Sequence, residues 1–73
     1  MQPIPLPSHV HYELLLQLLE QKTAYALNSS PETKREVQQL IITLRKALSQ
    51  QKNIEASCDR ENLPYEHHWS LNS

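Results

Sequence analysis

Apolar residues recur with helical spacing along two segments of the chain. The first segment holds an apolar cluster, Leu14, Leu15, Leu16, Leu18 and Leu19. At about 100° per residue, its apolar side chains span roughly 200° of the helical wheel, against the ~100° stripe of a surface helix. Ser8 is a suitable N-cap. The pattern predicts a helix over residues 8–28 whose apolar surface is too wide for one neighbouring helix to cover.

The short run Asn28-Ser29-Ser30-Pro31 separates this helix from a second one. Ser30 as N-cap with Pro31 at the first helical position is a strong start signal. It predicts a helix over residues 30–58, with an apolar stripe formed by Val37, Leu40, Ile41, Leu44, Ala47 and Leu48. A connection this short makes the two helices antiparallel neighbours.

Both ends of the chain lack helical spacing. Residues 1–7 alternate proline with other residues, which favours an extended arm that is either docked or frayed. The tail, residues 59–73, contains Pro64, which ends any helix. Alternating positions in the tail carry Tyr65, His67, Trp69 and Leu71. We expect this stretch to lie extended over the hairpin, without a second strand to pair with; the alternative is a disordered hook for a partner.

These segments predict an all-α fold, a single helical-hairpin domain over residues 1–73. A core of this size rarely supplies more than ~3–5 kcal/mol, so small proteins need a disulfide, a metal or oligomerisation. The single cysteine, Cys58, excludes an internal disulfide. We therefore expect the hairpin to dimerise into a four-helix bundle. The residues expected to form its core and interface are Leu15, Leu16, Leu19, Ile41, Leu44 and Leu48.

Composition limits what the chain can bind and where in the cell we expect it. Seven Lys and Arg against eight Asp and Glu give a net charge of −1, so no overall field attracts nucleic acid or an anionic membrane. The leucine cluster is far shorter than the ~20 residues of a membrane span. The lone cysteine and the absence of a signal-peptide pattern indicate a cytoplasmic protein. Glycine is absent, so Asn28, Asn53 and Asn62 are the candidates for left-handed backbone.

No set of residues predicts catalysis, a cofactor or a metal. His9 and His11 diverge by about 200° on a helix and cannot share an ion. Cys58 and His67 lack a second cysteine to complete a zinc site. Neither Cys58 nor any serine has an activating base nearby in the sequence. We expect the chain not to be an enzyme.

A band of cations lies opposite the apolar stripe of the second helix. It comprises Lys34, Arg35, Arg45, Lys46 and Lys52, with Ile42 at its centre. The band is either an ordinary solvated face or a surface for an acidic protein, an anionic surface or nucleic acid. Five cations without interleaved aromatic residues are a weak nucleic-acid signal.

The motif Pro5-Leu6-Pro7-Ser8, the runs 11–20 and 37–48, and the closing Trp69-Ser70-Leu71-Asn72 resemble a family of short uncharacterised cyanobacterial proteins. The resemblance implies a bacterial cytoplasm, with a setting near the photosynthetic apparatus as one option, and no assigned activity. The expected function is a non-catalytic protein–protein interaction or regulatory accessory module. The alternatives are binding of nucleic acid or an anionic surface through the basic band, and a small subunit of a larger, photosynthesis-related assembly.

Overall fold

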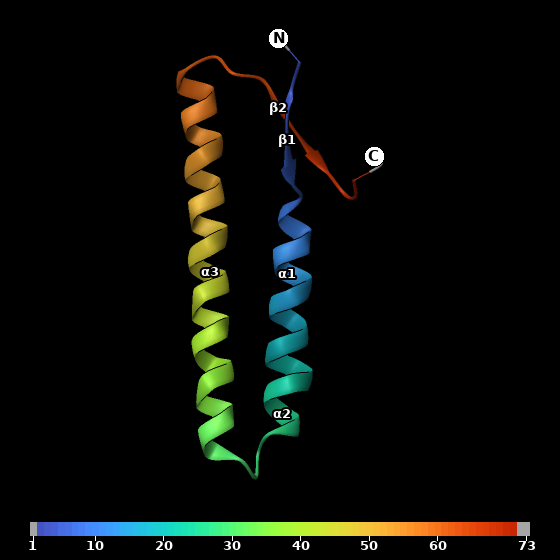
Figure 1. The fold of residues 1–73 in the computed structure, drawn as a ribbon, viewed down its shortest axis with the longest axis vertical. Helices are drawn as coiled ribbons and strands as arrows, with labels where there is room; N and C mark the ends of the chain where they lie inside the picture. Colours follow the sequence, from blue (N-terminus) through green and yellow to red (C-terminus); the bar gives the residue numbers. More distant parts are fainter. Residues whose placement is uncertain (1, 72–73) are drawn as a thin grey trace.

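A computed structural model describes residues 2–71, and the terminal Met1, Asn72 and Ser73 of the expected arm and tail lie outside the described residues. The chain is a long slab with principal extents of 52 × 25 × 13 Å. Two antiparallel helical arms lie side by side in one layer, and both chain ends meet in a small sheet at one end (Figure 1). The 13 Å extent is close to the diameter of a single helix, ~10–12 Å, so the hairpin has two open broad faces.

The first helical arm consists of α1 (His9–Leu18), the π-helical segment η1 (Leu19–Thr23) and α2 (Ala24–Ala26). The Ser8 hydroxyl caps α1 by accepting a hydrogen bond from the Val10 amide at 3.3 Å. In η1 the Ala24 amide donates to the Leu19 carbonyl, five residues back. The π turn inserts one extra residue into the helical repeat. It therefore shifts which side chains of α2 face the other arm.

The second arm is the single helix α3 (Pro31–Arg60), with Ser30 at the N-cap position. Its end is a Schellman motif, in which the Leu63 amide donates to the Cys58 carbonyl at 2.8 Å. Asn62 occupies the left-handed position of this motif with φ 57°. Among residues 2–71 Asn62 has the only positive φ, whereas Asn53 lies within α3.

The two ends pair as a parallel two-stranded sheet of β1 (Ile4–Pro7) and β2 (Tyr65–His68). The register places Ile4 beside Tyr65 and Pro7 beside His68. Prolines at alternate positions leave β1 with amide donors only at Ile4 and Leu6, and the Ile4 amide donates to the Pro64 carbonyl at 2.9 Å. Proline is tolerated at such a sheet edge because the missing donors face away from the partner strand.

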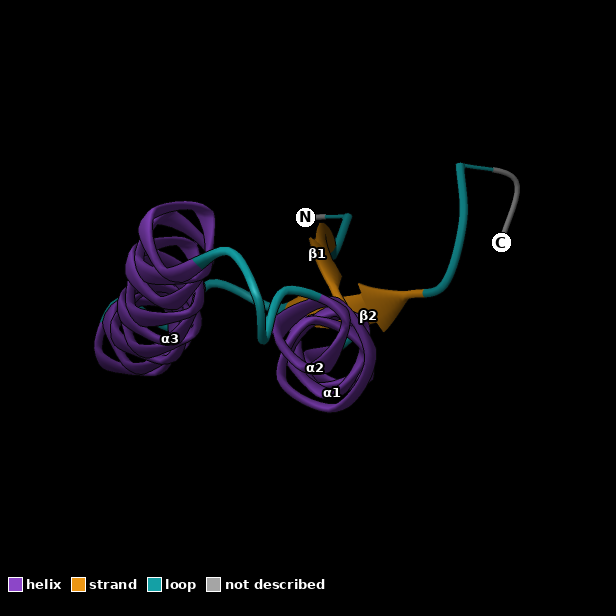
Figure 2. Ribbon diagram, turned by 90° about the horizontal axis from the view of Figure 1, so that it is seen from below, coloured by secondary structure: helices purple, strands orange, loops and turns teal. Residues whose placement is uncertain are grey.

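The prediction of an all-α fold is therefore wrong. The proline-rich arm is the second strand that the tail appeared to lack, and the pairing joins segments about 60 residues apart (Figure 2). Nothing in the structure supports dimerisation into a four-helix bundle. None of the described helices combines the length and apolarity that crossing a membrane requires.

The core is one layer of side chains between α3 and the first arm. In the described part of the chain, Ile41 and Cys58 are the buried apolar residues, with 8% and 5% of their surface exposed. Leu16, Leu19 and Leu44 are only half-buried. Because this core is thin, the polar contacts at the sheet end contribute a larger share of the folding stability than they would in a larger domain.

We predict that Asn62→Ala destabilises the protein by about 1 kcal/mol, because an alanine Cβ is strained at positive φ. Asn62→Gly should be neutral or stabilising. The matched control is Asn53→Ala in the helix interior, where alanine is the better helix former. Urea unfolding followed by circular dichroism measures all three. A loss for Asn53→Ala as large as for Asn62→Ala would contradict the assignment of the motif.

Candidate functional site

Two polar residues occupy positions where the stripe of α3 is otherwise apolar. The stripe runs at spacings of three and four through Ile41, Leu44, Leu48, Gln51, Glu55 and Cys58. Gln51 and Glu55 are both buried, with 4% and 8% of their surface exposed. A buried carboxylate is costly unless it is hydrogen-bonded or paired. The partners of Glu55 therefore define the candidate site.

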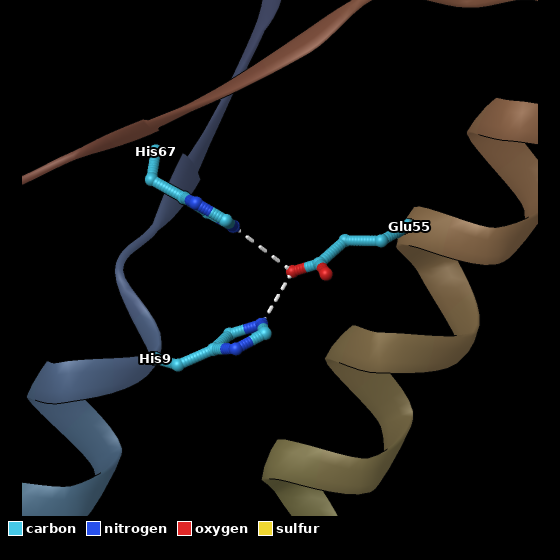
Figure 3. Close-up of side chains that lie close together, drawn as sticks. All are labelled: His9, Glu55 and His67. Atoms are coloured by element: carbon cyan, nitrogen blue, oxygen red, sulfur yellow. Dashed lines mark hydrogen bonds and ion pairs between the residues drawn. The ribbon is translucent and has the colours of Figure 1, made fainter.

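Glu55 Oε2 accepts hydrogen bonds from two histidines on different elements (Figure 3). His9, the first residue of α1, places its Nε2 at 2.7 Å, and His67 of β2 places its Nε2 at 3.2 Å. The two imidazole rings are tilted by 55° with centroids 5.0 Å apart. The carboxylate only accepts, so both histidines present an Nε2 proton to the same oxygen.

Gln51 completes the network from one turn earlier on α3. Its Nε2 donates to Glu55 Oε2 at 3.0 Å and to the Pro7 carbonyl at 2.7 Å. The second bond satisfies the last carbonyl of β1, at the point where the chain turns into α1. Gln51 and Glu55 thus connect α3 to β1, α1 and β2, and we call His9, Gln51, Glu55 and His67 the end cluster.

Glu55 is ionised throughout the ordinary pH range. Burial by itself raises the pKa of its carboxyl group. Hydrogen bonds from Gln51, His9 and His67, together with the charge of His9, outweigh burial and lower the pKa from 4.5 to about 2. The end cluster therefore holds a permanent negative charge with two histidines against it.

The side of the end cluster toward β2 is aromatic. The Tyr65 ring meets the His67 ring edge-on, with centroids 5.9 Å apart. Partial desolvation raises the pKa of the Tyr65 hydroxyl, and the negative charges of Asp59 and Glu55 add to the effect. Tyr65 therefore stays protonated at neutral pH.

The other two histidines point elsewhere. His11 Nε2 donates to the Trp69 carbonyl at 3.0 Å, and the two rings meet edge-on at 5.3 Å. His68 Nε2 donates to Glu66 Oε1 at 2.7 Å on the exposed side of β2. His9 and His11 do diverge, but His9 meets a histidine from the far end of the chain.

The residues expected at the core and interface differ in exposure. Ile41 is buried, whereas Leu16, Leu19, Leu44 and Leu48 are half-buried between the two arms. Leu15 points away from this contact and has 49% of its surface exposed.

The basic band is partly engaged within the chain. Lys34 donates to the Asn28 side chain at 2.8 Å, and Arg45 pairs with Glu20 of η1. Arg35, Lys46 and Lys52 are exposed. A shallow hollow of about 420 Å³ lies among Ile42, Arg45 and Lys46. Surface ion pairs such as Arg45–Glu20 contribute ~0–1 kcal/mol, so the pair orients the arms more than it stabilises them.

The sequence interpretation missed Glu55 and Gln51, and with them the end cluster. A signal was present, because both residues fall on the core stripe at helical spacing, where a polar side chain needs a partner. The identity of those partners was not readable, since His9 and His67 are brought together only by the pairing of β1 with β2.

Residues 1–70 match a family described as a family of unknown function, DUF5340. A similar protein from Anabaena cylindrica, described as an uncharacterized 9.3 kDa protein in the soluble hydrogenase 5′ region, is 49% identical over 72 residues. That alignment covers 99% of this chain and 88% of the relative. No solved structure matches the chain. The resemblance to short uncharacterised cyanobacterial proteins is thereby confirmed.

We predict that the charge of Glu55 stabilises the fold in metal-free buffer. Glu55→Gln keeps the volume of the side chain but removes the charge, and should cost roughly 1–3 kcal/mol at pH 7. The folded-state pKa of about 2 lies below the unfolded value of 4.5, so the contribution is complete above pH 4.5 and is lost as pH falls toward 2.

Urea unfolding between pH 7 and pH 2 with EDTA present measures this effect. The wild type should lose more stability across the window than Glu55→Gln does. Glu66→Gln, on the exposed side of β2, is the control and should follow the wild type. Identical pH profiles for the wild type and Glu55→Gln would show that the carboxylate does not hold the ends.

Proposed function

Because the chain belongs to this family of unknown function, its role has to be argued from its own surface, and we propose that it is a non-catalytic protein–protein interaction module. The partner is a protein that covers one broad face of the hairpin. A single observation carries the proposal: among residues 2–71 ten large apolar side chains are exposed, whereas the buried apolar side chains are those of Ile41 and Cys58.

The apolar surface is extensive for a chain of this size. The apolar side chains with 45% or more of their surface exposed include Leu14, Leu15, Leu18, Tyr25, Leu40, Ile42, Ile54 and Trp69. Isolated exposed apolar residues are normal, but a contiguous group marks an interaction surface. A broad face of 52 by 25 Å has room for the ~800 Å² per partner of a standard protein interface.

Several of these residues share one face. At about 100° per residue, Leu15 and Leu18 of α1 project to the same side of the hairpin as Leu40 and Ile54 of α3. The Arg45–Glu20 pair marks the opposite side. We call Leu15, Leu18, Leu40 and Ile54 the apolar face.

The apolar face continues toward the sheet. His11 lies one turn before Leu15 on the same side of α1 and contacts Trp69. Beside them is an open hollow of about 540 Å³ between β1 and the residues after β2, with Leu6 and Trp69 in its lining. A hollow of this kind suits an apolar side chain of a partner, since aromatic anchors in pockets supply much of the energy of an interface.

Binding through the basic band has less support. Lys34 and Arg45 already have partners within the chain, and the band lies on the side away from the apolar face. We therefore place the partner on the apolar face. A partner on the apolar face is compatible with a role as an accessory subunit of a larger assembly. Identifying the partner would identify that assembly.

Site-specific photo-crosslinking in a cyanobacterium tests the proposal. A crosslinking residue at Leu18 or Ile54 should capture one defined protein. The same residue at Gln17, on the opposite side of α1, or at Lys52 should capture it at least tenfold less. Mass spectrometry of the product identifies the partner and distinguishes another protein from a second copy.

Leu18→Glu is the companion variant. Leu18 has 54% of its surface exposed, so the charge should leave the thermal midpoint nearly unchanged while abolishing the crosslink at Ile54. Equal crosslinking from the two faces, or no effect of Leu18→Glu, would contradict a partner on the apolar face.

A further inference from the structure

The end cluster contains three side chains whose chemistry goes beyond a hydrogen-bonded clamp. We propose that His9, Glu55 and His67 form a binding site for a divalent transition-metal ion of the zinc class. The ion would be held by Nε2 of His9, Nε2 of His67 and a carboxylate oxygen of Glu55.

The three donor atoms lie close enough together to reach one metal ion after small side-chain movements. Zinc binds imidazole nitrogen and carboxylate oxygen at about 2.0–2.2 Å, which places neighbouring ligand atoms about 2.9–3.5 Å apart in octahedral or tetrahedral geometry. The nitrogen–oxygen separations here are 2.7 and 3.2 Å, and the three candidate atoms all lie within 4.8 Å of one another. Small rotations of the two imidazoles would therefore open the position that an ion needs.

The chemistry of the donors selects the class of ion. Two imidazoles and one carboxylate suit zinc, iron, cobalt or nickel, whereas magnesium and calcium prefer oxygen ligands alone. In the metal-free state an Nε2 proton of each histidine points at the Glu55 oxygen. A bound ion takes the place of those two protons, and each neutral histidine then carries its ring proton on Nδ1 instead of Nε2.

The residues around the three proposed ligands orient them and leave an opening to solvent. Gln51 donates to Glu55 and is itself fixed on the Pro7 carbonyl, which orients the carboxylate from behind. Glu55 is buried, whereas the side chains of His9 and His67 are 32% and 40% exposed. The histidines therefore form an entry from solvent, and a fourth position on the ion is open to water.

The three ligands come from α1, α3 and β2, and so an ion would join elements that are distant in the sequence (Figure 3). A structural metal is one of the ways in which chains of this length make up for a thin core. Occupation of the site would fasten the sheet to α3, close to the hollow at the end of the apolar face. The ordering of both chain ends would thus depend on whether the metal ion is available.

Isothermal titration of the chelator-treated, desalted protein with ZnCl2 tests the proposal. One equivalent should bind, and thermal melting should shift upward. His67→Gln is the principal variant, because it keeps a donor toward Glu55 but lacks the imidazole nitrogen. It should weaken zinc binding at least tenfold and remove the thermal shift while remaining folded.

The chain supplies its own controls, since His11→Ala and His68→Ala remove histidines outside the end cluster and should keep the affinity of the wild type. Should His67→Gln fail to fold, histidine-selective NMR of the wild type gives the same answer: zinc should perturb Nε2 of His9 and His67 and leave that of His68 unchanged. Wild-type affinity in His67→Gln, loss of binding in His11→Ala or His68→Ala, or no stoichiometric binding would each overturn the site.

Discussion

The buried Glu55 carboxylate is the interaction on which the rest of the structure depends. It lies on the longest helix and accepts hydrogen bonds from His9 and His67, while Gln51 links the same oxygen to the end of β1. Every segment at the sheet end is therefore tied to α3 through one polar group. The apolar core is a single layer, so hydrophobic packing alone fixes the positions of the two chain ends only weakly. The hydrogen-bonded network specifies where they lie.

The sheet and the end cluster support each other. The strands have four residues each, and an isolated two-stranded sheet is marginal in water. Pairing β1 with β2 brings His67 to His9, and the polar contacts in turn hold the strands in register. Alternate prolines prevent β1 from pairing on its outer edge, which protects the exposed sheet from further strand addition. The thin layer leaves apolar side chains on an open face, and this is the feature we interpret functionally.

Local signals predicted much of this architecture. Ser8, Ser30 and Pro31 indicate where the helical arms begin, and the spacing of Ile41, Leu44 and Leu48 indicates the inner stripe of α3. The parallel pairing was not predictable in the same way, because it depends on contacts between segments about 60 residues apart and proline-rich strands carry little strand signal. The sequence pattern alone drew attention only to histidines and Cys58 as candidate metal ligands, because Glu55 joins His9 and His67 only in the folded chain.

The most direct test of the central claim is a solution NMR measurement on the unmodified protein, namely the nuclear Overhauser effects between the ring protons of His9 and His67. With ring centroids 5.0 Å apart, these contacts should be observed together with cross-strand contacts between Ile4 and Tyr65. A chain whose helices are formed but whose ends show neither set of contacts would contradict the account, because the end cluster would then not exist in solution.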